Sequence, residues 1–134
     1  QLLFDRNVEK NLEFVLKATG WTNASEISIR IDEVLDKVGL TDKRKIMPHR
    51  LSGGEQQGIA IARALLNDPD VILADEPTGN LDPETTIEVM KLMRRISENG
   101  TAVLMATHNY TLMQKYPSRI ANCKNGTVVC SEME

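Results

Sequence analysis

The stretch Leu51-Ser52-Gly53-Gly54-Glu55-Gln56-Gln57 places two adjacent glycines at the start of a predicted helix. Ser52 can act as the N-cap, and Glu55, three residues later, completes a capping box. A capped helix start presents unpaired backbone N–H groups and a partial positive charge, so this turn is a candidate phosphate site. A plain capped surface helix is the alternative interpretation. The apolar residues of the helix repeat at helical spacing: Ile59, Ile61, Ala62, Leu65 and Leu66.

Downstream of this helix, the apolar run Val71-Ile72-Leu73-Ala74 predicts a short strand. The run does not alternate with polar residues, which is typical of a strand covered on both faces. It ends in Asp75-Glu76, which places two carboxylates at the carboxyl edge of a parallel sheet, where ligands bind in α/β folds. Asp75 suits a Mg²⁺ site, and Glu76 suits a group that orients and polarises an attacking water. A turn pair without chemistry is the alternative.

A second apolar strand is predicted over Thr101 to Ala106, and His108 follows it. His108 is therefore expected at the same edge of the sheet, where it can bind a phosphate oxygen and hold the water-positioning group. A histidine after a strand is also common as a plain surface residue. Between the two strands, Asp82 and Pro83 predict the N-cap and first residue of a long helix.

The rest of the chain is predicted to be helical at its start and to end in a β-hairpin. Helices are expected over 8–19, 24–38 and from about 109 to 117. The hairpin is expected to turn at Asn125-Gly126, which places Cys123 opposite Val128 and not opposite Cys130. The two cysteines are therefore expected to be reduced structural thiols.

Composition narrows the class of protein. The 134 residues are 41% hydrophobic and 4% aromatic, which fits one globular unit with an aliphatic core. The net charge of −3 lacks the excess of positive charge that is typical of nucleic-acid-binding proteins, so nucleic acid is not an expected partner. No apolar run approaches the roughly 20 residues of a membrane span.

Together, the order and spacing of these motifs resemble the ATP-binding-cassette (ABC) ATPases over nearly the whole chain. Leu51 to Gln56 is similar to the signature motif of that family, and Val71 to Glu76 to its Walker B strand. Gly79 to Asp82 is similar to the D-loop, and His108 to the switch histidine.

The resemblance implies an α/β fold of the P-loop NTPase type. Residues 1–66 would form a helical subdomain that includes the signature helix. Residues 67–134 would form the C-terminal part of the RecA-like ATPase core, with a parallel sheet and a terminal β-hairpin. The resemblance also implies ATP and Mg²⁺ as cofactors, with Glu76 and His108 as catalytic residues and Asp75 at the metal. Residues implied to bind an ATP held mainly by a second copy are Ser52, Gly53, Gly54, Glu55, Gln56 and, across the dimer interface, Asp82.

Two features depart from the family pattern. The phosphate-binding motif Gly-x-x-x-x-Gly-Lys-Ser/Thr does not occur in the 134 residues. We therefore expect the chain to be the C-terminal part of a longer module and to be inactive alone. Gly58 stands where the family usually carries arginine, and glycine inside a helix costs about 1 kcal/mol relative to alanine.

The leading hypothesis is the ATPase subunit of a membrane-associated ABC complex that closes as a head-to-tail homodimer. Such a subunit would lie at the cytoplasmic face of the inner membrane and bind an integral membrane partner. The stretch from Asp75 to Asp82 is similar to the subgroup that includes macrolide and lipoprotein exporters and a cell-division ATPase. The opening stretch from Asp5 to Phe14 most resembles the cell-division ATPase, which implies a role in cell division. One alternative is a chromosome-maintenance ATPase of the SMC or DNA-repair type, although the long heptad coils of that type are not seen here. Another is a non-catalytic interaction module.

Overall fold

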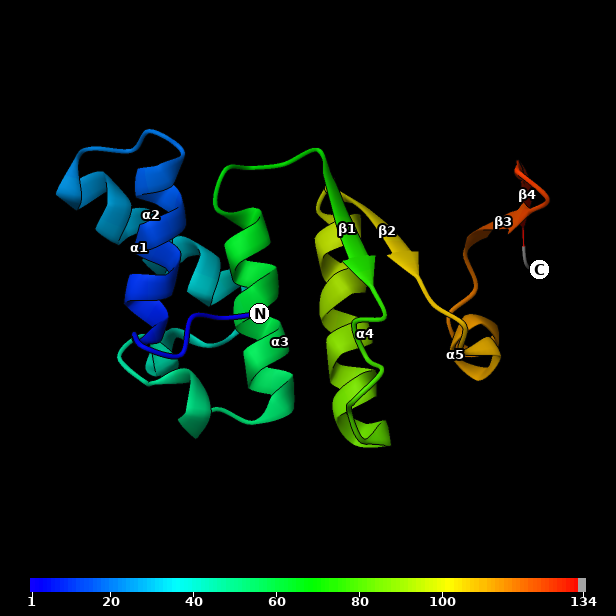
Figure 1. The fold of residues 1–134 in the computed structure, drawn as a ribbon, viewed down its shortest axis with the longest axis horizontal. Coiled ribbons are helices and arrows are strands. Elements are labelled where there is room, and N and C mark those ends of the chain that lie inside the picture. The colour runs from blue at the N-terminus through cyan, green and yellow to red at the C-terminus, as the bar shows by residue number, and fades with distance from the viewer. Residues whose placement is uncertain (133–134) are drawn as a thin grey trace.

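The computed structural model describes residues 1–132, which run from an all-helical first part to a mixed second part (Figure 1). The described elements of the first part are α1 (Val8–Ala18), α2 (Ala24–Val38), the 3-10 helices η1 (Thr41–Lys43) and η2 (Pro48–Arg50), and α3 (Gly53–Leu65). Those of the second part are β1 (Val71–Asp75), α4 (Pro83–Glu98), β2 (Ala102–Ala106), α5 (Tyr110–Lys115), β3 (Arg119–Lys124) and β4 (Thr127–Glu132).

The helices begin and end within about two residues of the predicted bounds, and side chains next to them cap their ends. Asn7 and Asn23 each accept a hydrogen bond from a first-turn N–H group, of α1 and α2 respectively. Helix α2 ends at Gly39, whose φ of 71° is the left-handed conformation that glycine adopts without strain. The capping box of Ser52 and Glu55 is present at the start of α3, which confirms that prediction.

One apolar core joins the three N-terminal helices to α4 and β1. Arg30 of α2 is buried beside this core, and its guanidinium donates to the carbonyl oxygens of Leu65 and Leu66 at 2.9 and 2.8 Å. These are carbonyls at the end of α3, which have no partner within the helix. Arg30 therefore fixes the C-terminal end of α3, from which the chain leads into β1. Side chains that are fully buried in the core include Leu12, Leu16, Ile31, Leu35, Ile59 and Leu66.

Strands β1 and β2 pair in parallel, with Asp75 aligned to Ala106 at their carboxyl ends. Helix α4 connects the strands and packs against one face of the pair (Figure 1). The prediction that β1 would be covered on both faces is wrong for the described chain, because Leu73 and Leu104 are 74% and 58% exposed. Ile72 points to the other face and is buried. The described residues supply a covering helix for only one of the two faces.

After β2 the chain forms the short helix α5 and then the hairpin of β3 and β4, which projects from the rest of the molecule (Figure 1). The Asn125-Gly126 turn places Cys123 opposite Val128, as predicted. Cys130 lies opposite Ala121, and both cysteines are free and exposed.

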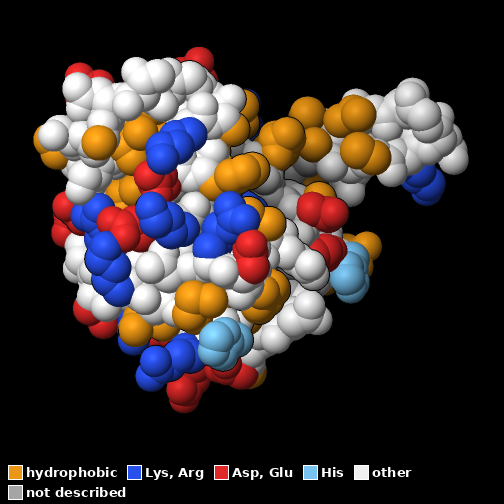
Figure 2. Space-filling view, turned by 60° about the vertical axis from the view of Figure 1, so that its left-hand side comes forward, with side chains coloured by type: hydrophobic (Ala, Val, Ile, Leu, Met, Phe, Trp, Pro, Cys, Tyr) orange, Lys and Arg blue, Asp and Glu red, His pale blue; other side chains and the backbone are white. Residues whose placement is uncertain are grey.

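The architecture confirms the predicted fold class, a helical part followed by a parallel α/β part and a terminal hairpin. On the face seen in Figure 2, Lys and Arg side chains are interspersed with Asp and Glu side chains over the helical part. Among residues 1–132, no helix has both the length and the apolar character needed to cross a membrane.

Candidate active site

The carboxyl edge of the parallel sheet brings together residues that are distant in sequence. The N–H group of Glu76 donates to the carbonyl oxygen of Ala106 at 2.9 Å, which extends the pairing one residue beyond β1. Glu76 itself has a φ of 44°, a left-handed conformation that is uncommon for a residue with a side chain. The chain therefore turns sharply at Glu76, directly beside the residues that follow β2.

His108 holds the carboxylate of Glu76 by two groups. Its backbone N–H donates to Oε1 of Glu76 at 2.8 Å, and its ring Nδ1 lies 2.5 Å from the same oxygen. An ionised carboxylate only accepts hydrogen bonds, so Nδ1 is the ring nitrogen that carries the proton in this contact. The imidazole is 90% exposed, whereas the Glu76 side chain is 34% exposed. The histidine can therefore reach a ligand at the surface while it stays bound to Glu76.

The second oxygen of Glu76 is also held. Oγ1 of Thr107 donates to Oε2 at 3.1 Å, so each carboxylate oxygen has a donor from the segment after β2. Burial alone would raise the pKa of Glu76, but the hydrogen bonds from His108 and Thr107 outweigh it and hold the pKa below its ordinary value. Glu76 is therefore a carboxylate at neutral pH, as an acceptor of a proton must be.

Asp75 is exposed at the end of β1, next to Glu76 in the chain. Within residues 1–132, no group of three or more His, Cys, Asp or Glu side chains is arranged to hold a metal ion. A single carboxylate at this edge nevertheless fits Mg²⁺, which commonly takes one or two protein carboxylates and completes its shell with waters and substrate phosphates.

The first turn of α3 offers donors that have no partner in the described chain. The N–H of Glu55 donates to Oγ of Ser52, and the N–H of Gln56 to the Ser52 carbonyl. The N–H groups of Gly53 and Gly54 have no acceptor among residues 1–132, as expected for the first two positions of a helix. Two adjacent N–H groups at the positive end of a helix form a binding place for an anion.

The side chains of Glu55 and Gln56 are already used within the chain. The Glu55 carboxylate accepts the N–H of Ser52 at 2.9 Å, and this hydrogen bond is the main reason that its pKa is lowered. Nε2 of Gln56 donates to the carbonyl oxygen of Pro48 at 3.1 Å. Both residues shape the turn that Ser52 begins.

The starts of α3 and α4 lie in direct contact. A Cβ atom added to Gly54 would lie 2.3 Å from Cγ2 of Thr85, a distance that no side chain tolerates. Thr85 in turn donates through its N–H and its hydroxyl to the carboxylate of Asp82, the N-cap of α4. These hydrogen bonds lower the pKa of Asp82. Asp82 and the glycine turn therefore belong to one packed unit.

The structure thus sorts the predicted site residues into two groups. One group is at the sheet edge and contains Asp75, Glu76 and His108. The other is at the starts of α3 and α4 and contains Ser52, Gly53, Gly54, Glu55, Gln56 and Asp82. No hydrogen bond or ion pair within the described part of the chain joins the two groups.

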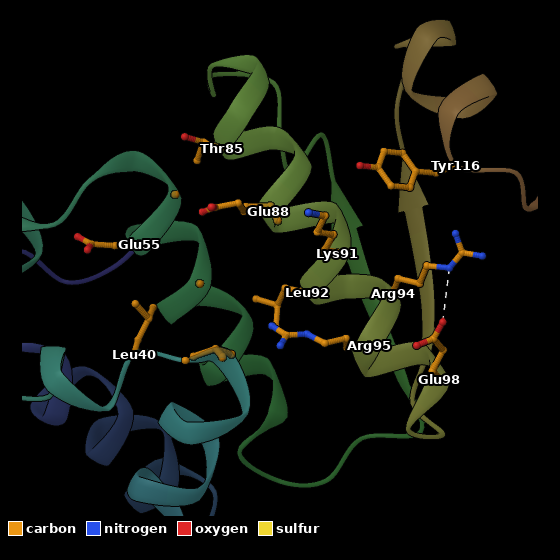
Figure 3. Close-up of a pocket in the computed structure, with 15 residues that line it drawn as sticks. Leu40, Glu55, Thr85, Glu88, Lys91, Leu92, Arg94, Arg95, Glu98 and Tyr116 are labelled. Carbon is orange, nitrogen blue, oxygen red and sulfur yellow. Dashed lines mark ion pairs between the residues drawn. The ribbon is translucent and has the colours of Figure 1, made fainter.

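A groove of about 710 Å³ lies between the end of α2, α3 and α4, and its lining is drawn in Figure 3. Glu55 and Thr85 line one end of it, and Arg95 and Leu40 lie further along. The sheet-edge group does not line this groove. Gly58 lines the groove, and a Cβ atom on Gly58 would lie 2.7 Å from Cδ1 of Leu40.

Sequence reasoning missed Thr85 and Thr107. A hydroxyl side chain directly after a predicted strand and next to His108 was a usable signal for Thr107. Thr85 had a weaker signal, its place three residues after an N-cap aspartate, where a first-turn N–H meets the cap.

Comparison with known proteins decides the family. The family model described as "ABC transporter" matches residues 2–79, which is more than half of the chain. The chain belongs to the ABC transporter family. The predicted resemblance is therefore confirmed.

Relatives in this family share close to half of the aligned residues. The "Cell division ATP-binding protein FtsE" of Streptococcus pneumoniae serotype 2 (strain D39 / NCTC 7466) is 47% identical over 98% of this chain and 57% of that protein. The protein of the same name from Bacillus subtilis (strain 168) is 46% identical over 98% of this chain and 58% of that protein. The "Methionine import ATP-binding protein MetN 2" of Salmonella typhi is 43% identical over 96% of this chain and 38% of that protein. This chain thus spans little more than half the length of the two relatives named FtsE.

A solved structure agrees with the fold. The "Dimeric Structure of MJ0796, a Bacterial ABC Transporter Cassette" matches all of this chain and 60% of that chain, with a TM-score of 0.77 and 34% identity. The described arrangement is therefore that of part of an ABC cassette.

Proposed function

We propose that this chain contributes the water-activating and signature parts of an ATP-hydrolysing subunit, and that the full-length protein works in a membrane-associated ABC complex. The observation that carries the proposal is the carboxylate of Glu76 held at the sheet edge by the backbone and ring of His108. Such a fixed, ionised carboxylate next to an exposed imidazole suits the orientation of a water molecule toward a phosphate.

Each residue at the sheet edge has a separate task in this proposal. Glu76 accepts a hydrogen bond from the attacking water and draws off its proton. His108 keeps Glu76 in place through Nδ1 and presents the rest of its ring to the phosphate. Asp75 would hold Mg²⁺ directly or through a water, and a bound Mg²⁺ would neutralise charge on the phosphates.

The start of α3 is proposed to serve an ATP molecule bound mainly by a second copy of the protein. Ser52 and the free N–H groups of Gly53 and Gly54 would contact its γ-phosphate, and Glu55 and Gln56 would keep that turn in shape. Asp82, which packs on the same unit through Thr85, would lie at the dimer interface. Two observations support this proposal: the sheet-edge residues and the glycine turn form separate groups, and the similar solved cassette is dimeric.

The domain organisation and the partner complete the proposal. Residues 1–66 would be the helical subdomain and residues 67–134 the C-terminal part of the ATPase core. The relatives named as cell division ATP-binding proteins favour a role in cell division. In this proposal the full-length protein binds an integral membrane partner of the FtsX or permease type at the cytoplasmic face of the inner membrane.

The experiment is steady-state ATP hydrolysis by the full-length protein and by its Glu76→Gln variant. Glutamine keeps the shape of the side chain but cannot take a proton, so we expect turnover to fall by about 10²-fold or more. Glu98→Gln, at the exposed end of α4, is the matched control and should hydrolyse ATP as the wild type does. Undiminished turnover by Glu76→Gln would show the proposal to be wrong.

A further inference from the structure

Thr107 connects Glu76 to the segment that leads into α5. Its Oγ1 lies 3.1 Å from Oε2 of Glu76 and 3.1 Å from the backbone nitrogen of Asn109. Asn109 is the N-cap of α5 and accepts the N–H of Leu112. One hydroxyl group therefore lies between the carboxylate and the first residues of a helix.

The two contacts determine the direction of the hydroxyl proton. The N–H of Asn109 has a proton to donate, so it occupies a lone pair of Oγ1. The carboxylate of Glu76 has only lone pairs, so the single proton of Thr107 points toward Oε2. A change of the Thr107 side-chain rotamer would move Oγ1 and therefore break both contacts.

The contact also matters for the orientation of the carboxylate. Both hydrogen bonds from His108 go to Oε1, so they alone leave the plane of the carboxylate free to tilt about that oxygen. The terminal torsion of glutamate is broad, so this plane is not set by the side chain itself. The bond from Thr107 to Oε2 removes this freedom.

We propose that Thr107 is a positioning residue that sets the plane of the Glu76 carboxylate for the attack of water. The inference rests on the proposed function, because it gives Thr107 a role only through Glu76. A misdirected carboxylate affects the chemical step and not the binding of ATP, so the loss should fall on kcat with little change in KM.

The test compares Thr107→Val with Thr107→Ser in the full-length protein, with Glu76→Gln measured in parallel. Valine keeps the shape of threonine without a hydroxyl, and we expect kcat to fall about 5- to 20-fold while KM stays within about twofold. Serine restores the hydroxyl and should keep kcat within about twofold of the wild type. Thr127→Val is the matched control, because its hydroxyl binds a backbone carbonyl in the projecting hairpin, and it should leave kcat unchanged.

The outcomes separate this inference from the proposed function. If Glu76→Gln loses turnover but Thr107→Val keeps the kcat of the wild type, the inference that Thr107 positions Glu76 is wrong and the proposed function stands. If Thr107→Ser is impaired as much as Thr107→Val, the hydroxyl does not position Glu76 and the inference is also wrong. If Glu76→Gln retains turnover, both fail. Thr107→Ala replaces the valine variant under the same criteria if the latter does not fold.

Discussion

The side chain of Thr85 fills the space that any side chain on Gly54 would need. A Cβ atom on Gly54 would stand 2.3 Å from Cγ2 of Thr85. Thr85 cannot easily turn aside, because its hydroxyl and its N–H both bind Asp82. The glycine at this position is therefore required by the packing of α3 on α4, in addition to any contact with phosphate.

Gly54→Ala should destabilise the protein because it forces α3 and α4 apart. We expect the free energy of unfolding to fall by about 1–3 kcal/mol, as is usual when a well-packed contact is overfilled. The measurement is urea unfolding followed by circular dichroism. A double variant with Thr85→Ser, which removes the clashing methyl group, should recover part of the loss. An unchanged midpoint for Gly54→Ala would show that the two helices are not in contact as described.

Gly58→Ala on the same helix should behave differently. The nearest atom to its added Cβ is Cδ1 of Leu40, the far end of a flexible side chain, which can move. Alanine also has the better helix propensity by about 1 kcal/mol. We expect a midpoint equal to that of the wild type or slightly higher, and a loss as large as that of Gly54→Ala would contradict the account of this groove.

Arg30→Met should be one of the more damaging changes in the helical part. The buried guanidinium binds the carbonyls of Leu65 and Leu66 and the carboxylate of Asp68. Its removal leaves the carbonyl of Leu66 without a partner among the described residues, whereas the carbonyl of Leu65 keeps the N–H of Asp68 and the carboxylate of Asp68 is exposed. We therefore expect a loss of about 1–3 kcal/mol in the free energy of unfolding. Arg94→Met is the control, because Arg94 is 61% exposed and bound only to exposed Glu98 among the described residues. Equal effects of the two changes would contradict the structural role of Arg30.

The stability of the helical part should depend on Glu13 in acid. Hydrogen bonds from Lys10 and Lys17 lower the pKa of Glu13 from 4.5 to about 2. A carboxyl whose pKa is lowered by folding stabilises the protein fully above its unfolded value of 4.5, and this contribution is lost as the pH falls toward 2. The lysines are well exposed, so the contribution is about 1 kcal/mol or less. Unfolding midpoints measured from about pH 6 to about pH 3 should therefore fall less steeply in Glu13→Gln than in the wild type, and parallel curves would contradict the assignment.

Local signals in the sequence predicted the elements well because they act over a few residues. Asn7 and Asn23 cap the helices that follow them, and the Asn125-Gly126 turn sets the register of the hairpin. Each of these features depends on a side chain and the backbone within about four residues of it.

Features that depend on tertiary contacts could not be predicted in the same way. The apolar run of β1 indicated cover on both faces, but periodicity does not say which segment supplies the cover, and Leu73 is exposed. The meeting of Glu76 and His108 is an exception that could be predicted, because parallel strands end at one edge of their sheet. The bond from Thr107 to Oε2 of Glu76 depends on one side-chain rotamer, and the contact of Gly54 with Thr85 depends on the distance between two helices.

The central claim is that a complete site needs the glycine turn of one copy and the sheet edge of another. Mixing two inactive full-length variants tests this claim directly. Ser52→Glu places a carboxylate where the phosphate would bind, and Glu76→Gln removes the proton acceptor, so each full-length variant alone should be inactive. A mixed dimer in a head-to-tail arrangement has one site with both groups intact. Random assortment makes half of the dimers mixed, so we expect ATP hydrolysis to return to about a quarter of the wild-type rate. A mixture that forms mixed dimers and stays as inactive as its components would contradict the claim.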